Sequence, residues 1–256
     1  MGKVTFRKSF DRSSCRLFLT PTLHCRDSQI TDQLKVVNDD FNQTSLSFEV
    51  QNITRITNEE WFNITSGSTQ ETDMKTSLRN LGPLERTDAS TLSIYTVGHV
   101  VSDGDSVLGY ATFPDEHEAN PALDGIVLLY TTLPGGSEAP FNQGRTLTHL
   151  IGHWVGLYHT FQGGCNGDGD FVDNTPAEAS ATYGCPTNNP DTCSGEGLDR
   201  ESTFRSSPSG FVTYSLSFLA IHNYMDYTDD SCMDNFTSSQ IGRLLSRISA
   251  YRGIDV

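Results

Sequence analysis

The 256-residue sequence has no long apolar run, few basic residues and few histidines. No stretch approaches the roughly 20 apolar residues of a membrane-spanning helix, which argues against membrane insertion. Lys and Arg number 17 against 32 Asp and Glu, and the net charge of −15 argues against nucleic acid and anionic membranes as partners. No internal repeat is present, and residues 1–25 contain no recognisable signal peptide because their basic residues flank no continuous apolar stretch. The length suits one domain, or two close-packed lobes.

Cysteine is present in an even number, together with four N-glycosylation sequons. Six cysteines fit up to three disulfides in an oxidising compartment, and the alternative is six reduced thiols in a cytosolic protein. The sequons begin at Asn42, Asn52, Asn63 and Asn235, each with Thr two residues on. These features together predict a secreted, extracellular glycoprotein.

Helix and strand patterns alternate over the first 155 residues. Asp27 and Ser28 can cap a helix whose apolar residues recur at helical spacing as far as Phe41. A second helix is predicted over 69–81, and a third over 143–155. Strands are predicted where apolar and polar residues alternate or apolar residues run together between turns: 46–50, 91–101, 107–113 and 125–132.

We predict one domain over 1–256 with two lobes. Residues 27–155 form an N-terminal α/β lobe, and 156–256 form a lobe of Gly, Asp, Pro and Cys-rich loops that ends in a helix from about 237. Residues 1–26 are divergent, and Cys15 and Cys25 can bracket a short strand and turn closed by a disulfide.

Three of the seven histidines fall in one window with the pattern H-x-x-x-H-x-x-G-x-x-H. His149 and His153 are four residues apart, so on a helix they share one face and can bind one metal ion. Gly156 can adopt the left-handed conformation that ends a helix and returns His159 to the same ion. Single histidines are usually packed core residues, but three in register with a glycine are hard to explain in that way. Three imidazoles with an open fourth position predict one catalytic zinc ion.

Six segments of the sequence resemble the pappalysin-type metzincin metallopeptidases and, among them, the small secreted extracellular metalloproteases of fungi. The likeness runs from about residue 27 to 250 with one interruption. The six segments are 144–149, 152–154, 156–161, 163–165, 173–178 and 223–227.

The resemblance implies an α+β, metzincin-like zincin fold. Its N-terminal lobe has a twisted mixed β-sheet with two helices, and its C-terminal lobe is irregular, disulfide-rich and ends in a helix. It implies endopeptidase activity on protein or peptide substrates. It also implies two disulfides, Cys165–Cys193 and Cys185–Cys232, which leave Cys15–Cys25 as the third pair.

In the same family a turn bearing Met lies beneath the histidines, and here it corresponds to Met225 in Asn-Tyr-Met-Asp-Tyr. Taken alone, Met225 would be a core residue and Tyr227 a buried ring with its hydroxyl bonded to the backbone. By resemblance, Met225 is an apolar floor, and Tyr227 donates to the oxyanion of a tetrahedral intermediate.

A glycine-rich loop after the histidines carries closely spaced oxygen ligands that suit calcium, namely Asp168, Asp170, Asp173 and Thr175. From spacing alone a solvated acidic loop is equally compatible. The resemblance favours a calcium site, because related enzymes bind calcium in this lobe.

Leu150 stands where the family carries Glu as general base. That Glu takes a proton from the attacking water and passes it to the leaving amine, and its loss typically costs about 10²–10⁴-fold in rate. Glu116, Glu118 and Glu138 are the carboxylates that could replace it if the fold brought one to the site. The function predicted is a secreted zinc metalloendopeptidase impaired at Leu150, and the alternative is an inactive zinc-binding pseudopeptidase that binds peptides or a protein partner.

A second departure from the family is the aromatic-bearing segment 201–220, which we interpret as an insertion or an error in the gene.

Overall fold

The computed structural model describes residues 13–19, 25–79, 89–187, 192–193 and 220–255. The chain divides into two compact units, Met1–Gly156 with Leu245–Val256, and Leu157–Leu244. No helix among the described residues is long and apolar enough to cross a bilayer.

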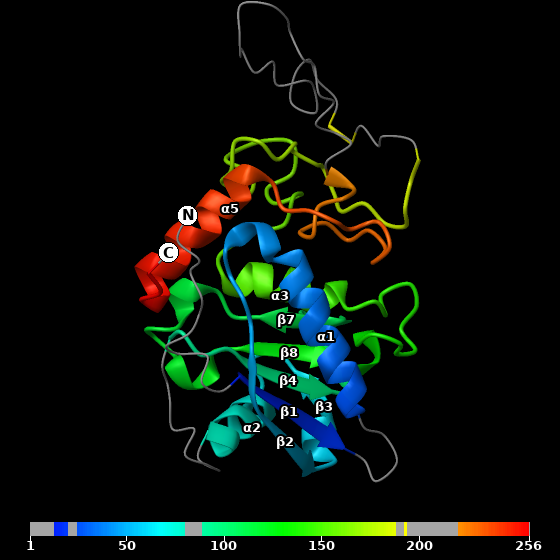
Figure 1. Ribbon diagram of the computed structural model, residues 1–256, viewed down its shortest axis with the longest axis vertical. Helices are drawn as coiled ribbons and strands as arrows, with labels where there is room; N and C mark the ends of the chain where they lie inside the picture. Colours follow the sequence, from blue (N-terminus) through cyan, green and yellow to red (C-terminus); the bar gives the residue numbers. More distant parts are fainter. Residues whose placement is uncertain (1–12, 20–24, 80–88, 188–191, 194–219, 256) are drawn as a thin grey trace, which may run out of the picture. The chain divides into compact units, whose positions relative to one another are not determined.

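The first unit contains a mixed five-stranded sheet in the order β2-β1-β4-β8-β7 (Figure 1). Four strands are parallel, and β7 runs antiparallel to β8 at one edge. This is the mixed sheet that the resemblance implies. In that order the strands are Val50–Thr57, Ser13–Leu19, Ser93–Val97, Ile126–Leu129 and Gly109–Ala111.

Strand β1 lies inside the divergent segment 1–26, and the disulfide predicted there is wrong. Cys15 pairs in register between Ile53 of β2 and Ile94 of β4. Cys25, just before helix α1 (Asp27–Asp40), is buried and free. Burial raises the pKa of its thiol to about 11, with a hydrogen bond to Thr96 acting in the opposite direction. Cys15 is thus held in the middle of a strand, while Cys25 packs as a free thiol.

A second sheet has the order β3-β5-β6. Strand β3 (Asn63–Thr65) is parallel to β5 (His99–Ser102), and β6 (Asp105–Ser106) is antiparallel to β5. The strand predicted over 91–101 is therefore two strands in different sheets, divided at Gly98. A Cβ at Gly98 would lie 1.9 Å from the Phe62 ring, so only glycine fits at this break.

The strand predicted over 46–50 is displaced toward the C-terminus. Leu46 and Phe48 are buried as expected, but strand pairing begins only at Val50. The Asn38 side chain bonds both the amide and the carbonyl of Phe48, at 2.7 and 2.9 Å. These bonds satisfy the backbone of this segment from helix α1 and replace a strand partner.

Three α-helices lie wholly in the described part of the first unit: α1 (Asp27–Asp40), α2 (Thr69–Arg79) and α3 (Arg145–Trp154). Helix α3 packs against β7, β8 and α1. A hydrophobic core cluster joins α2 to β3, β4, β5 and β8. It consists of Ile64, Met74, Leu78, Tyr95, Val97, Val100 and Val127. Five short 3₁₀ helices complete the described part of this unit: Asn42–Thr44, Glu60–Phe62, Pro114–Glu116, Pro121–Leu123 and Tyr130–Thr132.

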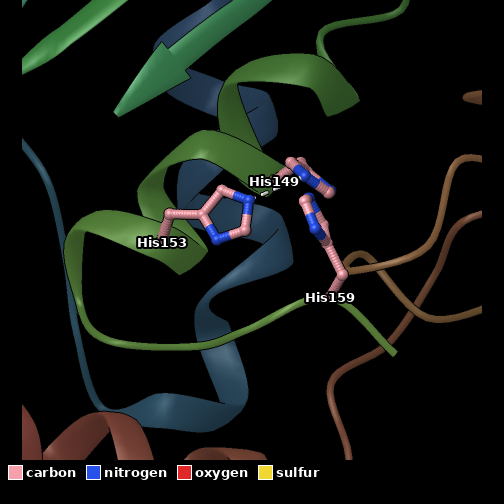
Figure 2. A group of neighbouring side chains, drawn as sticks. All are labelled: His149, His153 and His159. Atoms are coloured by element: carbon pink, nitrogen blue, oxygen red, sulfur yellow. Dashed lines mark hydrogen bonds between the residues drawn. The ribbon is translucent and has the colours of Figure 1, made fainter. Parts of the chain in front are cut away.

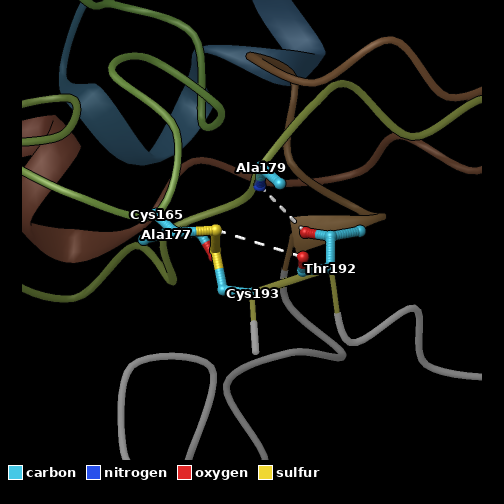
Figure 3. The surroundings of a disulfide bond; sticks show 5 residues. All are labelled: Cys165, Ala177, Ala179, Thr192 and Cys193. Atoms are coloured by element: carbon cyan, nitrogen blue, oxygen red, sulfur yellow. Dashed lines mark hydrogen bonds between the residues drawn. A yellow bond between two sulfur atoms is a disulfide. The ribbon is translucent and has the colours of Figure 1, made fainter. Parts of the chain in front are cut away.

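The second unit is irregular over its described residues until helix α5 (Ser238–Arg252) begins near its end. Two disulfides close it, Cys165–Cys193 and Cys185–Cys232, which is the pairing that the resemblance implies. Figure 3 shows the first, beside the hydrogen bond from the Ala179 amide to the Thr192 hydroxyl. The predicted insertion 201–220 falls outside the described residues except for Ala220.

Candidate metal centre

Helix α3 places His149 and His153 one turn apart. It starts after Gly144, whose φ of 93° is left-handed and whose carbonyl accepts a hydrogen bond from the buried Gln33 amide at 2.9 Å. The Thr148 hydroxyl donates to Asp40 of α1 at 2.6 Å. A buried polar contact thus fixes the helix directly beside His149.

Gly156 makes the turn that follows the helix. Its φ is +101°, and its amide donates to the carbonyl of His153 at 2.9 Å. A Cβ here would lie 2.8 Å from the Arg247 side chain, in a conformation that L residues rarely adopt. Both the backbone and the available space therefore require glycine.

The rings of His149, His153 and His159 point toward one another (Figure 2), and their candidate ligand atoms lie within 4.8 Å of each other. The Nε2 atoms of His149 and His153 are 3.1 Å apart. Zn–N bonds of about 2.0–2.1 Å in a tetrahedron place nitrogens roughly 3.3 Å apart, so this donor set fits zinc. Two of the rings are 8% exposed, and the third is half-buried.

Tyr227 lies beside the third histidine. Its hydroxyl is 3.2 Å from Nε2 of His159, and its side chain is 36% exposed. The Phe161 ring stacks on His159 at 4.6 Å. Burial raises the pKa of Tyr227, and Tyr183 and Asp226 raise it further, so the hydroxyl keeps its proton at neutral pH.

Met225 is fully buried in a tight turn. Its amide donates to the Asn223 side chain at 2.9 Å, and the Asn223 side chain is in turn bonded to Gln240 at 2.8 and 3.1 Å. The Met225 carbonyl accepts from the amide of Thr160, the residue after His159. The methionine turn is therefore hydrogen-bonded to the segment that carries the third imidazole.

Leu150 is 4% exposed and packs against β7. A Cβ placed on Gly109 would lie 2.6 Å from its Cδ1 atom, so the leucine fills the space above that glycine. Among the described residues, the candidate metal-binding group contains no carboxylate. Glu116 caps the Phe113 amide and Glu138 accepts from Thr131, while Glu118 lines a surface pocket beside Pro114.

The loop proposed for calcium contains buried oxygen atoms. Asp170 is 5% exposed, and its Oδ2 atom and Oδ1 of Asn174 have no hydrogen-bond partner among the residues that the structure describes. Burial raises the pKa of Asp170 to about 6, against the opposing effect of the Thr175 hydroxyl. Asp168 and Asp173 are exposed. Sequence reasoning missed Asn174, although it lies between two of the predicted ligands.

The sequons differ in accessibility. Asn42 and Asn63 are exposed, whereas Asn235 is half-buried and donates to its neighbour Asp234. The side chain of Asn52 lies outside the described part of the structure.

A mixed sheet with one antiparallel edge strand, packed beside a helix that carries two converging histidines, is the architecture of metzincin-like metallopeptidases. The profile of the M43 peptidases, described as Pregnancy-associated plasma protein-A, matches residues 92–249. The chain belongs to this pappalysin-type metallopeptidase family.

Individual relatives agree with this membership. An extracellular metalloprotease of Pyricularia oryzae is 39% identical over 228 residues, covering 88% of this chain and 69% of that protein. One from Verticillium alfalfae is 40% identical over 231 residues, with the same two coverages. The solved structure of Tannerella forsythia mature mirolysin in complex with a cleaved peptide superposes with a TM-score of 0.69 at 26% identity, covering 95% of this chain and 92% of that one. The family implies a catalytic zinc ion, which the three imidazoles fit.

Proposed function

We propose that this chain is a secreted zinc metalloendopeptidase that hydrolyses peptide bonds of extracellular proteins, and that Leu150 impairs its catalysis. The convergence of three imidazoles within 4.8 Å, in a member of a metallopeptidase family, carries the proposal. The relatives named as extracellular metalloproteases, the two disulfides and the exposed sequon residues Asn42 and Asn63 support secretion.

The residues of the site have distinct tasks. His149, His153 and His159 hold the metal. Zinc, when bound there, supplies a Lewis acid that polarises a peptide carbonyl and acidifies water. Tyr227, whose hydroxyl lies 3.2 Å from Nε2 of His159, donates a hydrogen bond to the oxyanion that develops on the substrate.

Leu150 can neither accept nor donate a proton. Its side chain is buried against Gly109, and no described carboxylate joins the three imidazoles to act in its place. The chain therefore lacks the general base that would transfer a proton from water to the leaving amine, and we expect slow turnover.

The test is Leu150→Glu, assayed on casein and on a quenched peptide in the presence and absence of a zinc chelator. We expect kcat/KM to rise by about 10²–10⁴-fold, with zinc content unchanged at one ion per chain. Leu150→Gln is the matched control, because glutamine has the shape of glutamate but cannot act as a base. Its rate should stay at that of the parent. A parent chain that already cleaves as fast as Leu150→Glu would contradict the impairment.

The packed state of Leu150 also favours a second candidate, a zinc-binding pseudopeptidase that binds peptides or a protein partner. The buried Leu150 side chain packs between α3 and β7 and offers the site no reactive group. This candidate predicts stoichiometric peptide binding that a chelator abolishes, with no cleavage product in mass spectra after prolonged incubation. Accumulating cleavage products would rule it out.

We further propose that the 168–175 loop binds calcium. Asp170, Asn174 and Thr175 offer closely spaced oxygens, and Oδ2 of Asp170 and Oδ1 of Asn174 are buried without partners in the described structure. Calcium should raise the melting temperature of the parent chain and bind with measurable heat in titration calorimetry. Asp170→Asn should remove both effects, whereas Asp105→Asn, an exposed residue of β6, should leave them unchanged.

A further inference from the structure

Arg252 lies at the end of helix α5, and its side chain is completely buried. Its two terminal nitrogens donate to Asp124 at 3.0 and 3.1 Å. Its Nε donates to the carbonyl of Trp154 at 3.0 Å, and its guanidinium lies over the Trp154 ring at 3.5 Å from the centroid. One arginine thus contacts both the backbone and the side chain of the residue that follows His153.

Trp154 is the last residue of helix α3. The final carbonyls of a helix have no partner inside the helix and need donors from elsewhere. Arg252 supplies such a donor at the end of the helix that carries two of the three imidazoles. This bond holds the backbone between His153 and the Gly156 turn.

Asp124 accepts hydrogen bonds from Trp154 and Thr112, two residues that lie near His153. Its Oδ2 accepts from the Trp154 indole at 3.2 Å, and its Oδ1 accepts from the Thr112 hydroxyl at 2.7 Å. Thr112 is followed by Phe113, whose ring lies 5.3 Å from the His153 ring. The carboxylate therefore fixes the residue after His153 and the residue before the ring that packs on it.

The ion pair keeps its charge at neutral pH. Burial alone would raise the pKa of Asp124, but the charge and hydrogen bonds of Arg252, with those of Thr112 and Trp154, outweigh it and lower the pKa below its usual value. The Arg252–Asp124 pair therefore stays charged and doubly hydrogen-bonded at neutral pH.

We propose that Arg252, acting through Asp124 and Trp154, is a positioning residue for His153 that sets the direction of this imidazole and thereby the affinity of the site for its metal. The inference rests on the proposed zinc site. An ion pair with a structural role alone would stabilise the fold without changing metal affinity at matched stability. Altering a group that orients a metal ligand through hydrogen bonds typically changes metal affinity by about 10–100-fold.

The experiment compares the parent chain with three variants: Arg252→Lys, Trp154→Phe and Leu78→Ala. Lysine keeps the charge but loses the two-pronged bond to Asp124 and the Nε donor, and phenylalanine keeps a stacking ring but loses the indole donor. Leu78 is fully buried in the core cluster of α2, so its truncation lowers stability without touching this network. Zinc affinity is measured by competition with a chromophoric chelator, the visible spectrum of the cobalt form reports ligand geometry, and thermal unfolding ranks stability.

We expect Arg252→Lys and Trp154→Phe to bind zinc about 10-fold or more weakly and to shift the cobalt spectrum. Leu78→Ala should lose as much stability while keeping the parent affinity and spectrum. If the two network variants bind zinc as the parent does, or if Leu78→Ala loses the same affinity, the inference is overturned and the metal site stands. A parent that binds no zinc overturns the metal site and this inference together.

Discussion

The two compact units are stabilised by different means. The described residues of the first unit form helices and sheets, and buried ion pairs stabilise them. These pairs include Lys75–Glu71 at 2.7 Å and Arg252–Asp124 at 3.0 Å. The second has two disulfides, glycine turns and side-chain-to-backbone hydrogen bonds over most of its described length. The difference shows that His149 and His153 are held by regular secondary structure, whereas His159 lies among loops that disulfides close.

A matched pair of contacts makes the comparison quantitative. In the first unit Thr148, next to His149, donates its hydroxyl to Asp40 at 2.6 Å. In the second unit Thr160, next to His159, donates to Glu178 at 2.7 Å. Both threonines are at most 1% exposed. Each unit therefore fixes the neighbour of a candidate metal ligand with a buried hydroxyl–carboxylate bond.

The largest expected effect comes from opening the second unit. Replacing Cys185 and Cys232 together by serine releases a loop with a sequence separation of 47, which costs about 4 kcal/mol in the chain-entropy model. We expect limited proteolysis to cut within 157–244, while amide exchange in β4 and β8 remains slow. Equal loss of protection in both units would show that they unfold as one, and the comparison would fail.

The threonine pair should give the next effect. Thr148→Val and Thr160→Val each remove a hydrogen bond to a charged group, worth about 1.5–3 kcal/mol. After the change, Asp40 keeps its ion pair with the cationic Arg145 at 3.2 Å, whereas Glu178 keeps a longer bond from the neutral Thr182 hydroxyl at 3.3 Å. Denaturant unfolding should show a loss of this size for both variants, and an unchanged midpoint for either one would contradict the match between the two contacts.

The smallest effect concerns pH. Burial raises the pKa of Asp226 to about 6, against hydrogen bonds from the backbone of Thr182 and Tyr227. The protonated form is favoured in the folded state, so its contribution to stability is complete below about pH 4 and is lost as the pH rises through 6.

Asp226→Asn should flatten this dependence and raise the free energy of unfolding at pH 7 by on the order of 1–2 kcal/mol. Thermal melts of both proteins between pH 4 and pH 8, in the presence of a calcium chelator, measure it. Parallel pH curves for the two proteins would show that Asp226 does not titrate in this range.

The helices and the histidine cluster could be predicted from local spacing, whereas the fold class and the two disulfides were implied only by the family resemblance. His149 and His153 follow helical periodicity, and Gly156 follows from the need for a left-handed turn. The division of 91–101 at Gly98 could not be predicted, since it depends on Phe62 arriving from a distant segment. The Arg252–Asp124–Trp154 network joins residues up to 128 positions apart, and no local pattern marks such a contact.

The buried Cys25 has a consequence for oxidative folding. Disulfides are exchanged by thiolates, not thiols, and a pKa of about 11 leaves roughly one molecule in a thousand ionised at pH 8. Once the first unit has closed around this sulfur, it becomes a poor nucleophile toward the bridges of the second unit. The order of events matters for this residue: a chain that buries Cys25 before its loops oxidise keeps the Cys25 thiol out of mispaired disulfides.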